Sequence, residues 1–267
     1  EMFKDIKQVM KDSVLYGIGN VAVKLVGFIL IPLYTDAEYF STADYGLMGL
    51  LEVTSQILIA VMGLSLYSGL IRWYWDAEYR DKQKTIFFTT LLFTILTSLC
   101  IGSVLWLNVG ELSALLVQQE GYSLGGELPY ILQLLILTSM LGAVVEVPQN
   151  LLRLQRKPIY YSLTNIVILF VTLVLTIYFT SSLHRGVSGV YEAQLVGIVI
   201  QLLMVLPLVI KNSSCRVDRR CTIQLLVYSY PLVFPAIVGS LLTVFDRYII
   251  NHFQGLDDVG FYSLGYK

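Results

Sequence analysis

Charged and metal-binding side chains are scarce in this sequence. Only 14% of its 267 residues are charged, whereas soluble domains average about 25%. Its three cysteines, Cys100, Cys215 and Cys221, form no CxxC pair, and its two histidines, His184 and His252, are far apart. This pattern excludes a disulfide scaffold and gives no sign of a zinc site. We therefore expect neither a metal nor an organic cofactor.

The balance of charge excludes other functions. Lysine and arginine number 18, aspartate and glutamate number 19, and the formal net charge is −1. The chain therefore has no overall positive field that would attract nucleic acid. It has no HExxH motif and no His–Asp pair, and its connections between apolar segments reach only about twenty residues. We expect a protein that is not an enzyme, and a membrane-embedded glycosyltransferase or acyltransferase is a distant alternative.

Long apolar segments are abundant instead. Hydrophobic residues make up 56% of the chain, and its mean hydropathy is +0.70. A helix needs about 20 mainly apolar residues to cross a bilayer. We predict seven such spans, over residues 13–35, 44–71, 85–107, 129–150, 158–181, 189–210 and 223–250. The spans lack the alternation of polar and apolar residues that β-barrel strands show, so the sequence predicts an all-α, polytopic membrane protein.

Lysine and arginine gather in alternate connections between these spans. One set of connections carries 14 of them: Lys4, Lys7, Lys11, Arg72, Arg80, Lys82, Lys84, Arg153, Arg156, Lys157, Lys211, Arg216, Arg219 and Arg220. The opposite set carries only Arg185. Basic connections remain in the cytoplasm during membrane insertion. The split therefore predicts a cytoplasmic N-terminus and supports the number of spans.

One short motif occurs twice. The second span begins with Asp44-Tyr-Gly-Leu47, and Asp258-Val-Gly-Phe261 follows 214 residues later (258 − 44). Each Asp stands where a helix N-cap is expected, although chance can produce so short a match. A true repeat predicts two six-helix bundles in a full chain. The predicted parts are a cytoplasmic N-terminal segment (1–12), a first six-helix bundle (13–210), a basic linker (211–222) and the start of a second bundle (223–267).

Ionisable residues at membrane depth are the first candidates for a functional site, because a charge in hydrocarbon is costly. Lys24 lies near the middle of the first span, on the same face as Asn20. The second span carries Glu52 and Gln56 one turn apart, and the fourth carries Glu146. We expect these side chains to face a polar cavity. The alternatives are helix packing by small and polar residues, or an internal ion pair between Lys24 and Glu52.

The seventh span combines two prolines with two adjacent charges. Pro231 and Pro235 each remove a backbone donor and disfavour a straight helix, which predicts a kink or a hinge. Asp246 and Arg247 follow near the outer end of this span. An interfacial ion pair is the alternative to a functional role for these two charges.

Six segments together resemble one family of transporters. In chain order they are Ser13-Val-Leu-Tyr-Gly-Ile-Gly-Asn20, Lys24-Leu-Val-Gly-Phe-Ile-Leu-Ile-Pro32-Leu-Tyr-Thr35, Ala43-Asp-Tyr-Gly-Leu47, Tyr230-Pro-Leu-Val-Phe-Pro235, Asp246-Arg-Tyr-Ile249 and Val259-Gly-Phe-Tyr-Ser-Leu-Gly-Tyr266. They are similar to the polysaccharide-biosynthesis flippases, which are O-antigen-type transporters of lipid-linked oligosaccharides in the multidrug/oligosaccharidyl-lipid/polysaccharide exporter (MOP) superfamily. The resemblance implies about twelve to fourteen helices in two pseudo-symmetric bundles around a central cavity. This sequence ends as its eighth helix begins, so we expect transport to require further helices.

The resemblance also implies a substrate and partners. The substrate would be an oligosaccharide linked to polyprenyl pyrophosphate. It would move from the cytoplasmic to the outer leaflet of the bacterial plasma (inner) membrane for assembly of surface polysaccharide such as the O-antigen of lipopolysaccharide. H+ or Na+ would be the coupling ion. Membrane lipid and polysaccharide-assembly proteins are the candidate partners, and nucleic acid is not expected.

Binding roles follow from the resemblance and from side-chain chemistry. Lys24 is the expected cation for the phosphates, because a pyrophosphate needs a positive partner away from water. The expected sugar contacts are the amides Asn20, Gln56 and Asn165.

Coupling roles are assigned in the same way. Glu52, Glu146 and Asp246 are the ion-coupling candidates, because a buried carboxylate can be neutral in one state and ionised in another. Pro231 and Pro235 are the expected hinge for alternating access.

Two relatives in the same superfamily are alternatives. A multidrug cation antiporter would need an acidic cavity; the midplane Lys24 argues against this function, whereas Glu52 and Glu146 favour it. A lipid II flippase would need a more strongly basic cavity than a single lysine provides.

Overall fold

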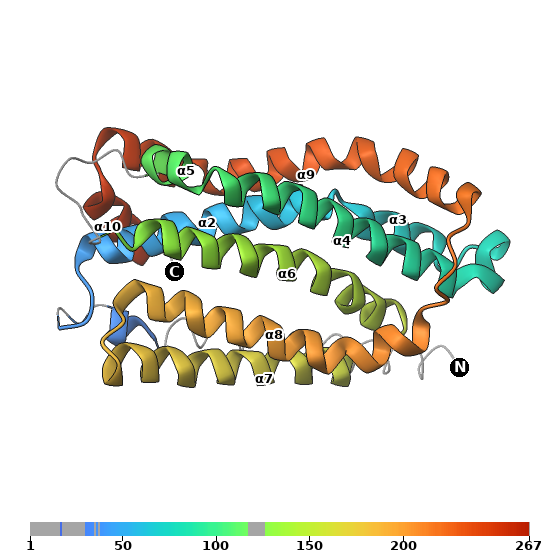
Figure 1. The fold of residues 1–267 in the computed structure, drawn as a ribbon, viewed down its shortest axis with the longest axis horizontal. Helices are drawn as coiled ribbons and strands as arrows, with labels where there is room; N and C mark the ends of the chain where they lie inside the picture. The colour runs from blue at the N-terminus through green and yellow to red at the C-terminus, as the bar shows by residue number, and fades with distance from the viewer. Residues whose placement is uncertain (1–16, 18–29, 35, 37, 117–125, 267) are drawn as a thin grey trace.

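The computed structural model describes residue 17 and residues 30–34, 36, 38–116 and 126–266. In this part of the chain the backbone forms helices and helical turns, without strands. The elements are α2 (Thr42–Gly63), α3 (Leu66–Trp73), the 3₁₀ turn η1 (Ala77–Lys82), α4 (Gln83–Leu107), α5 (Val109–Leu116), α6 (Leu128–Leu154), α7 (Pro158–Ile177), the π turn η2 (Tyr178–Ser182), α8 (Gly186–Asn212), α9 (Arg219–Phe253) and α10 (Leu256–Tyr266). The long helices lie side by side along the long axis of the molecule (Figure 1). The predicted all-α fold is confirmed.

Six helical segments among the described residues are long and apolar enough to cross a membrane. They are Thr42–Gly63, Ala77–Leu107, Leu128–Leu154, Pro158–Ser182, Gly186–Asn212 and Arg219–Leu242. They match the second to seventh predicted spans, whereas most of the first, 13–35, lies outside the described residues. Large apolar side chains such as Phe170 and Leu203 are 65% and 60% exposed, which suits contact with lipid tails. The chain is a multi-pass membrane protein.

The second predicted span is not a single helix. The sequence predicts one helix over 44–71, but α2 ends at Gly63 and α3 begins at Leu66. Between them, Leu64 and Ser65 have left-handed backbone angles, with φ of 44° and 50°. Residues other than glycine rarely adopt such angles. The prediction was wrong here because hydropathy does not report a local reversal of backbone twist.

Contacts from two other helices stabilise this break. The hydroxyl of Thr97 in α4 donates a hydrogen bond to the carbonyl of Met62 (2.8 Å). The hydroxyl of Ser65 donates to the carbonyl of Leu232 in α9 (3.3 Å). Interrupted helices are tolerated in membranes when neighbouring helices satisfy the backbone groups that the interruption frees.

The start of α2 corrects a second prediction. The N-cap is Ser41, and Asp44 is the third helical residue. Ser41 Oγ accepts the backbone N–H of Asp44 (3.1 Å), and Asp44 Oδ2 accepts the backbone N–H of Ser41 (2.9 Å). This is a capping box, in which the acidic residue reaches back from the first turn. Asp258 is likewise the third residue of α10, so both motifs occupy the same position in their helices.

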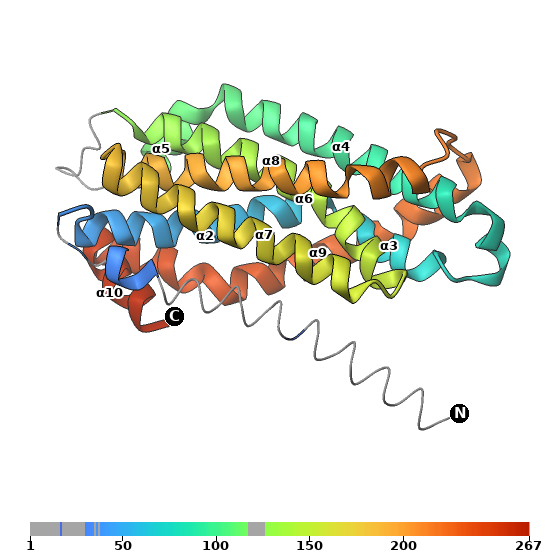
Figure 2. The ribbon, with the colours of Figure 1, turned by 90° about the horizontal axis from the view of Figure 1, so that it is seen from below.

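The first turns of α2 and α10 pack backbone against backbone (Figures 1 and 2). A Cβ atom on Gly46 would lie 1.9 Å from the carbonyl oxygen of Leu256, and one on Gly260 would lie 2.5 Å from that of Thr42. Leu256 follows Thr42 by 214 residues, and Gly260 follows Gly46 by 214 residues. The two contacts are therefore equivalent: exchanging each residue for its counterpart 214 positions away turns one contact into the other, as a two-fold axis between the helices would do. This geometry agrees with the internal repeat.

Three basic connections lie at one end of the bundle. They join α3 to α4, α6 to α7 and α8 to α9, and all three are on the right in Figure 1. Their basic residues are Arg72, Arg80, Lys82, Lys84, Arg153, Arg156, Lys157, Lys211, Arg216, Arg219 and Arg220. We call this the basic end. That it faces the cytoplasm remains a prediction.

One part of the core lies between α2 and α6. Leu47, Leu50 and Leu51 of α2 are buried against Ile131 and Leu135 of α6. Burying each such side chain contributes about 1.5–3 kcal/mol. One face of α2 is therefore buried against α6, and a different face carries its polar residues.

Candidate functional site

The polar face of α2 lines two cavities. Gly49, Glu52 and Gln56 border the first, and Gln56 and Gly63 border the second. Their volumes are about 300 Å³ and 530 Å³, within the range of small-molecule sites. In both, the surrounding walls include the last helices of the chain, α9 or α10. The cavities therefore lie between α2 and the helices α9 and α10.

The first cavity draws its walls from five parts of the chain. They are residues 30–34, α2, α8, α9 and α10, which contribute Leu30, Tyr34, Tyr45, Met48, Gly49, Glu52, Ser55, Gln56, Val190, Tyr191, Gln194, Arg247 and Ser263. Tyrosine and serine hydroxyls and glutamine amides can both donate and accept hydrogen bonds, as binding to sugar hydroxyls requires. Among these described residues there is one cation, Arg247, and one carboxylate, Glu52. The cavity suits a polar ligand that carries charge.

The second cavity lies at the break between α2 and α3. Its walls are Gln56, Ile59, Ala60, Gly63, Ser65, Tyr67, Glu146, Pro235, Ala236, Gly239 and Ser240. A Cβ atom on Gly63 would lie 3.8 Å from Oε2 of Glu146, so the carboxylate of α6 reaches the end of α2. Gln56 borders both cavities and separates Glu52 from Glu146 along this surface.

Asp246 and Arg247 connect α9 to α10. The hydroxyl of Tyr262 donates a hydrogen bond to Asp246, which also accepts the backbone N–H of Arg247 (2.8 Å). The Nε of Arg247 donates to Oγ of Ser263 (3.3 Å). Arg247 also borders the first cavity, whereas Asp246 borders neither of the two. The ion-coupling role of Asp246 remains a prediction.

The remaining predicted binding residues are not brought together with these. Asn165 belongs to α7, and its Oδ1 accepts a hydrogen bond from the side-chain amide of Gln201 in α8 (3.3 Å). It borders neither cavity. Lys24 and Asn20 lie outside the described residues. Their roles, and that of Asn165, remain predictions.

The two prolines lie inside one long helix. Helix α9 continues through both Pro231 and Pro235. Pro235 borders the second cavity, whereas Pro231 borders an apolar groove beside Trp73. The hinge remains a prediction.

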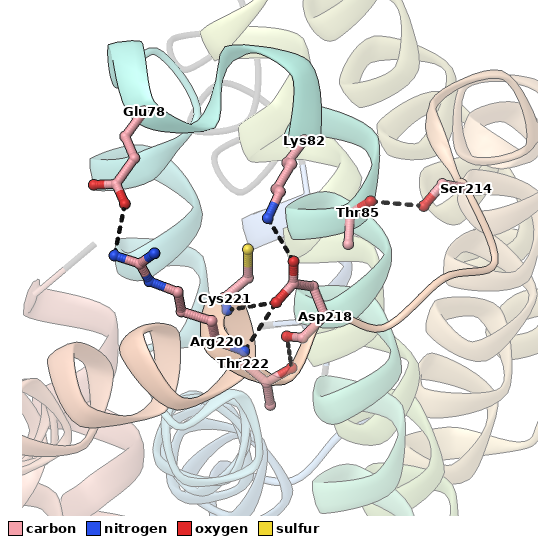
Figure 3. Close-up of polar contacts among 8 residues, drawn as sticks. All are labelled: Glu78, Lys82, Thr85, Ser214, Asp218, Arg220, Cys221 and Thr222. Carbon is pink, nitrogen blue, oxygen red and sulfur yellow. Dashed lines mark hydrogen bonds and ion pairs between the residues drawn. The ribbon is translucent and has the colours of Figure 1, made fainter.

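A polar cluster at the basic end attaches the start of α9 to η1 (Figure 3). Lys82 Nζ lies 2.6 Å from Oδ2 of Asp218, the N-cap of α9. Arg220 pairs with Glu78 across 3.0 Å. Both pairs join η1 to the start of α9. The cluster fixes where α9 begins relative to α4.

Asp218 also satisfies the backbone at the start of α9. Its Oδ1 accepts the N–H groups of Arg220 (2.9 Å) and Cys221 (3.3 Å). The hydrogen bond from Lys82, followed by that from the N–H of Cys221, holds the pKa of Asp218 below its usual range. Asp218 is therefore ionised at neutral pH.

Comparison with known proteins identifies the family. The sequence profile described as "Polysaccharide biosynthesis protein" matches residues 9–267. The chain belongs to the polysaccharide biosynthesis protein family. This confirms the resemblance carried by its motifs. No curated protein matches the sequence of this family member.

Solved structures share the fold of this polysaccharide biosynthesis protein at 16% identity. An outward-facing multidrug resistance MATE family transporter of the MOP superfamily has a TM-score of 0.69 and covers 97% of this chain and 59% of its own. A MOP superfamily transporter from Pyrococcus furiosus, whose binding pocket is described as having reverse polarity, has a TM-score of 0.67; the match covers 92% of this chain and 55% of that transporter. A MATE in complex with Br-NRF has a TM-score of 0.66; the match covers 92% of this chain and 57% of that MATE. This chain spans less than two thirds of these relatives.

Several cavity residues are absent from the sequence-based prediction. Tyr191 and Gln194 lie three residues apart near the start of α8, and this spacing on one face could have revealed them. Tyr34 and Tyr45 resemble ordinary interfacial aromatics in the sequence. From the sequence, Arg247 is a candidate for a functional role together with Asp246, with an interfacial ion pair as the alternative, but no cavity contact is predicted for it. Only the packing of α10 against α2 shows that Arg247 borders a cavity.

Proposed function

We propose that this protein is a flippase that moves a polyprenyl-pyrophosphate-linked oligosaccharide from the cytoplasmic to the outer leaflet of the bacterial plasma membrane. The supporting observation is that, in a member of this family, two cavities with polar and charged side chains in their walls lie between α2 and the α9–α10 region. A sugar–pyrophosphate head group cannot cross hydrocarbon unaided. A polar cavity between two bundles gives it a path while the polyprenyl tail stays in lipid.

The arrangement also supports ion-coupled alternating access. Glu52 and Glu146 each border one cavity, and Gln56 borders both. A carboxylate that is neutral in one state and ionised in another can couple ion movement to a change of access. H+ and Na+ are the candidate ions. Lys24, Asn20 and Asn165 remain proposed ligands of the phosphates and sugars.

The function can be tested in a full-length protein by complementing a bacterial strain that lacks its own surface-polysaccharide flippase. We expect wild type to restore surface polysaccharide. Transport in vesicles should respond to an imposed H+ or Na+ gradient, and Glu52→Gln or Glu146→Gln should abolish most of that response. Glu111→Gln is the matched control, because Glu111 is exposed on α5 away from both cavities. An unchanged gradient response in both cavity variants would contradict ion coupling through these carboxylates.

A multidrug cation antiporter is the second candidate function. It is favoured by the two cavity carboxylates and by a fold shared with a multidrug resistance transporter. Export of a fluorescent organic cation by the full-length protein, lost in Glu52→Gln, together with failure to restore polysaccharide, would establish this candidate instead. Polysaccharide-assembly proteins are proposed partners only of the flippase.

A further inference from the structure

Arg247 occupies an unusual position for a residue near the end of a membrane helix. It borders the first cavity together with Gln56 and Gln194, and it is only partly exposed. Its Nε donates to Ser263 of α10 (3.3 Å). This contact orients the guanidinium from one edge. Placing a cation at the cavity wall has a desolvation cost that packing alone does not explain.

The chemistry of the guanidinium indicates what it binds. A guanidinium presents five N–H donors in a planar fork, which suits two oxygens of a phosphate. The other polar groups of this wall are neutral hydroxyls and amides, apart from Glu52. Among the described residues that border the cavity, Arg247 is thus the single group with a full positive charge. An anionic head group with attached hydroxyls matches this set.

Glu52 borders the same cavity and carries the opposite charge. In a low-dielectric site, a carboxylate weakens anion binding either by repelling the anion or by attracting the guanidinium to itself. With a neutral side chain at this position, the anion would meet no carboxylate among the described residues that border the cavity. The two charges therefore act on an anionic ligand in opposite directions.

We propose that Arg247 binds the pyrophosphate of the substrate in the first cavity and that Glu52 competes with that anion for Arg247. This inference rests on the proposed flippase function and names a residue of its site. It links substrate to coupling ion, because an ion that neutralises Glu52 favours anion binding at Arg247.

The probe is inorganic pyrophosphate, titrated calorimetrically into the full-length protein in phosphatidylcholine nanodiscs. We expect Arg247→Gln to raise the dissociation constant at least tenfold, Arg247→Lys to raise it less, and Glu52→Gln to lower it severalfold. Arg185→Gln is the matched control, because Arg185 is exposed and paired with Glu192 (2.6 Å). Opposite effects of two variants in one cavity would not result from a general loss of structure.

Three outcomes would overturn the proposal. They are no pyrophosphate binding by wild type, equal binding by Arg247→Gln and wild type, or weaker binding by Glu52→Gln. Nanodiscs with phosphatidylglycerol distinguish the two sources of a phosphate that could bind Arg247, which are a membrane lipid and the substrate. If this lipid displaces pyrophosphate from Arg247, the group binds a membrane lipid and the substrate assignment fails.

Complementation separates this inference from the proposed function. Restored polysaccharide with pyrophosphate binding that does not depend on Arg247 overturns the anion site and leaves the flippase. Binding that depends on Arg247 in a protein that restores no polysaccharide overturns the flippase and leaves the anion site.

Discussion

The carboxylate of Asp218 has two structural roles at once. One oxygen caps the first turn of α9, and the other accepts a hydrogen bond from Lys82. Both interactions require or favour the ionised form, and this is why the pKa of Asp218 is lowered, mainly by Lys82 and then by the N–H of Cys221. A group whose pKa is lowered by folding stabilises the folded state at every pH above its unfolded pKa. That stabilisation is lost as pH falls through the folded pKa.

The pH dependence of Asp218→Asn tests this role. Asparagine retains a capping oxygen but loses the charge, so the variant should be slightly less heat-stable than wild type at pH 7. The difference should remain constant down to the ordinary carboxyl range and then disappear as pH falls further. Thermal unfolding of the detergent-purified protein at several pH values measures the difference in heat stability between the variant and wild type. Asp76→Asn, another capping variant near the basic end, is the control. A difference that grows at acidic pH would contradict the assignment.

At the level of helices, the contact between α2 and α10 leaves no room for a side chain. Gly260 lies against the carbonyl of Thr42, whereas nothing lies within 4 Å of a Cβ placed on Gly265 in the same helix. Adding a methyl group to a tight contact costs about 1–3 kcal/mol. Adding one at an open helical position replaces the flexible glycine with a better helix former.

Two alanine variants of α10 should therefore have opposite effects. Gly260→Ala should destabilise the full-length protein by about 1–3 kcal/mol, because α10 must move away from α2. Gly265→Ala should be neutral or stabilise it by up to about 1 kcal/mol. Chemical denaturation followed by circular dichroism compares them in one helix. Equal stabilities would show that the close contact does not form.

The helices also show what could be predicted from the sequence. Apolar length and the alternation of basic connections predicted the spans that the structure describes, because lipid contact and membrane insertion act on composition. The break at Leu64 and Ser65 could not be predicted, because it depends on hydrogen bonds with distant helices, one from Thr97 of α4 and one to the carbonyl of Leu232 of α9. The polar face of α2 was visible as a spacing of Glu52 and Gln56, whereas the role of Arg247 required knowledge of where α10 packs.

At the level of the whole molecule, the 214-residue register relates α2 to α10. Gly49 of α2 faces Ser263 of α10, and these two residues are also 214 positions apart. The contact therefore lies close to the two-fold axis that relates Gly46 and Gly260. Alternating access requires two bundles to separate at one end and then at the other. The α2–α10 contact lies at the end opposite the basic end (Figure 2), so we expect it to open during each transport cycle.

A disulfide across this contact tests that expectation. A Cβ built on Gly49 would lie 3.1 Å from Cβ of Ser263. A disulfide typically needs about 3.5–4.5 Å between the two Cβ atoms. The double variant Gly49→Cys with Ser263→Cys should therefore cross-link after a small movement of the two helices apart. In a full-length protein whose Cys100, Cys215 and Cys221 are replaced by serine, oxidation should stop polysaccharide export, and reduction should restore it. Each single cysteine variant should be insensitive to oxidant. Undiminished export by fully cross-linked protein would mean that α2 and α10 stay together throughout the cycle, and the opening must then occur between other helices.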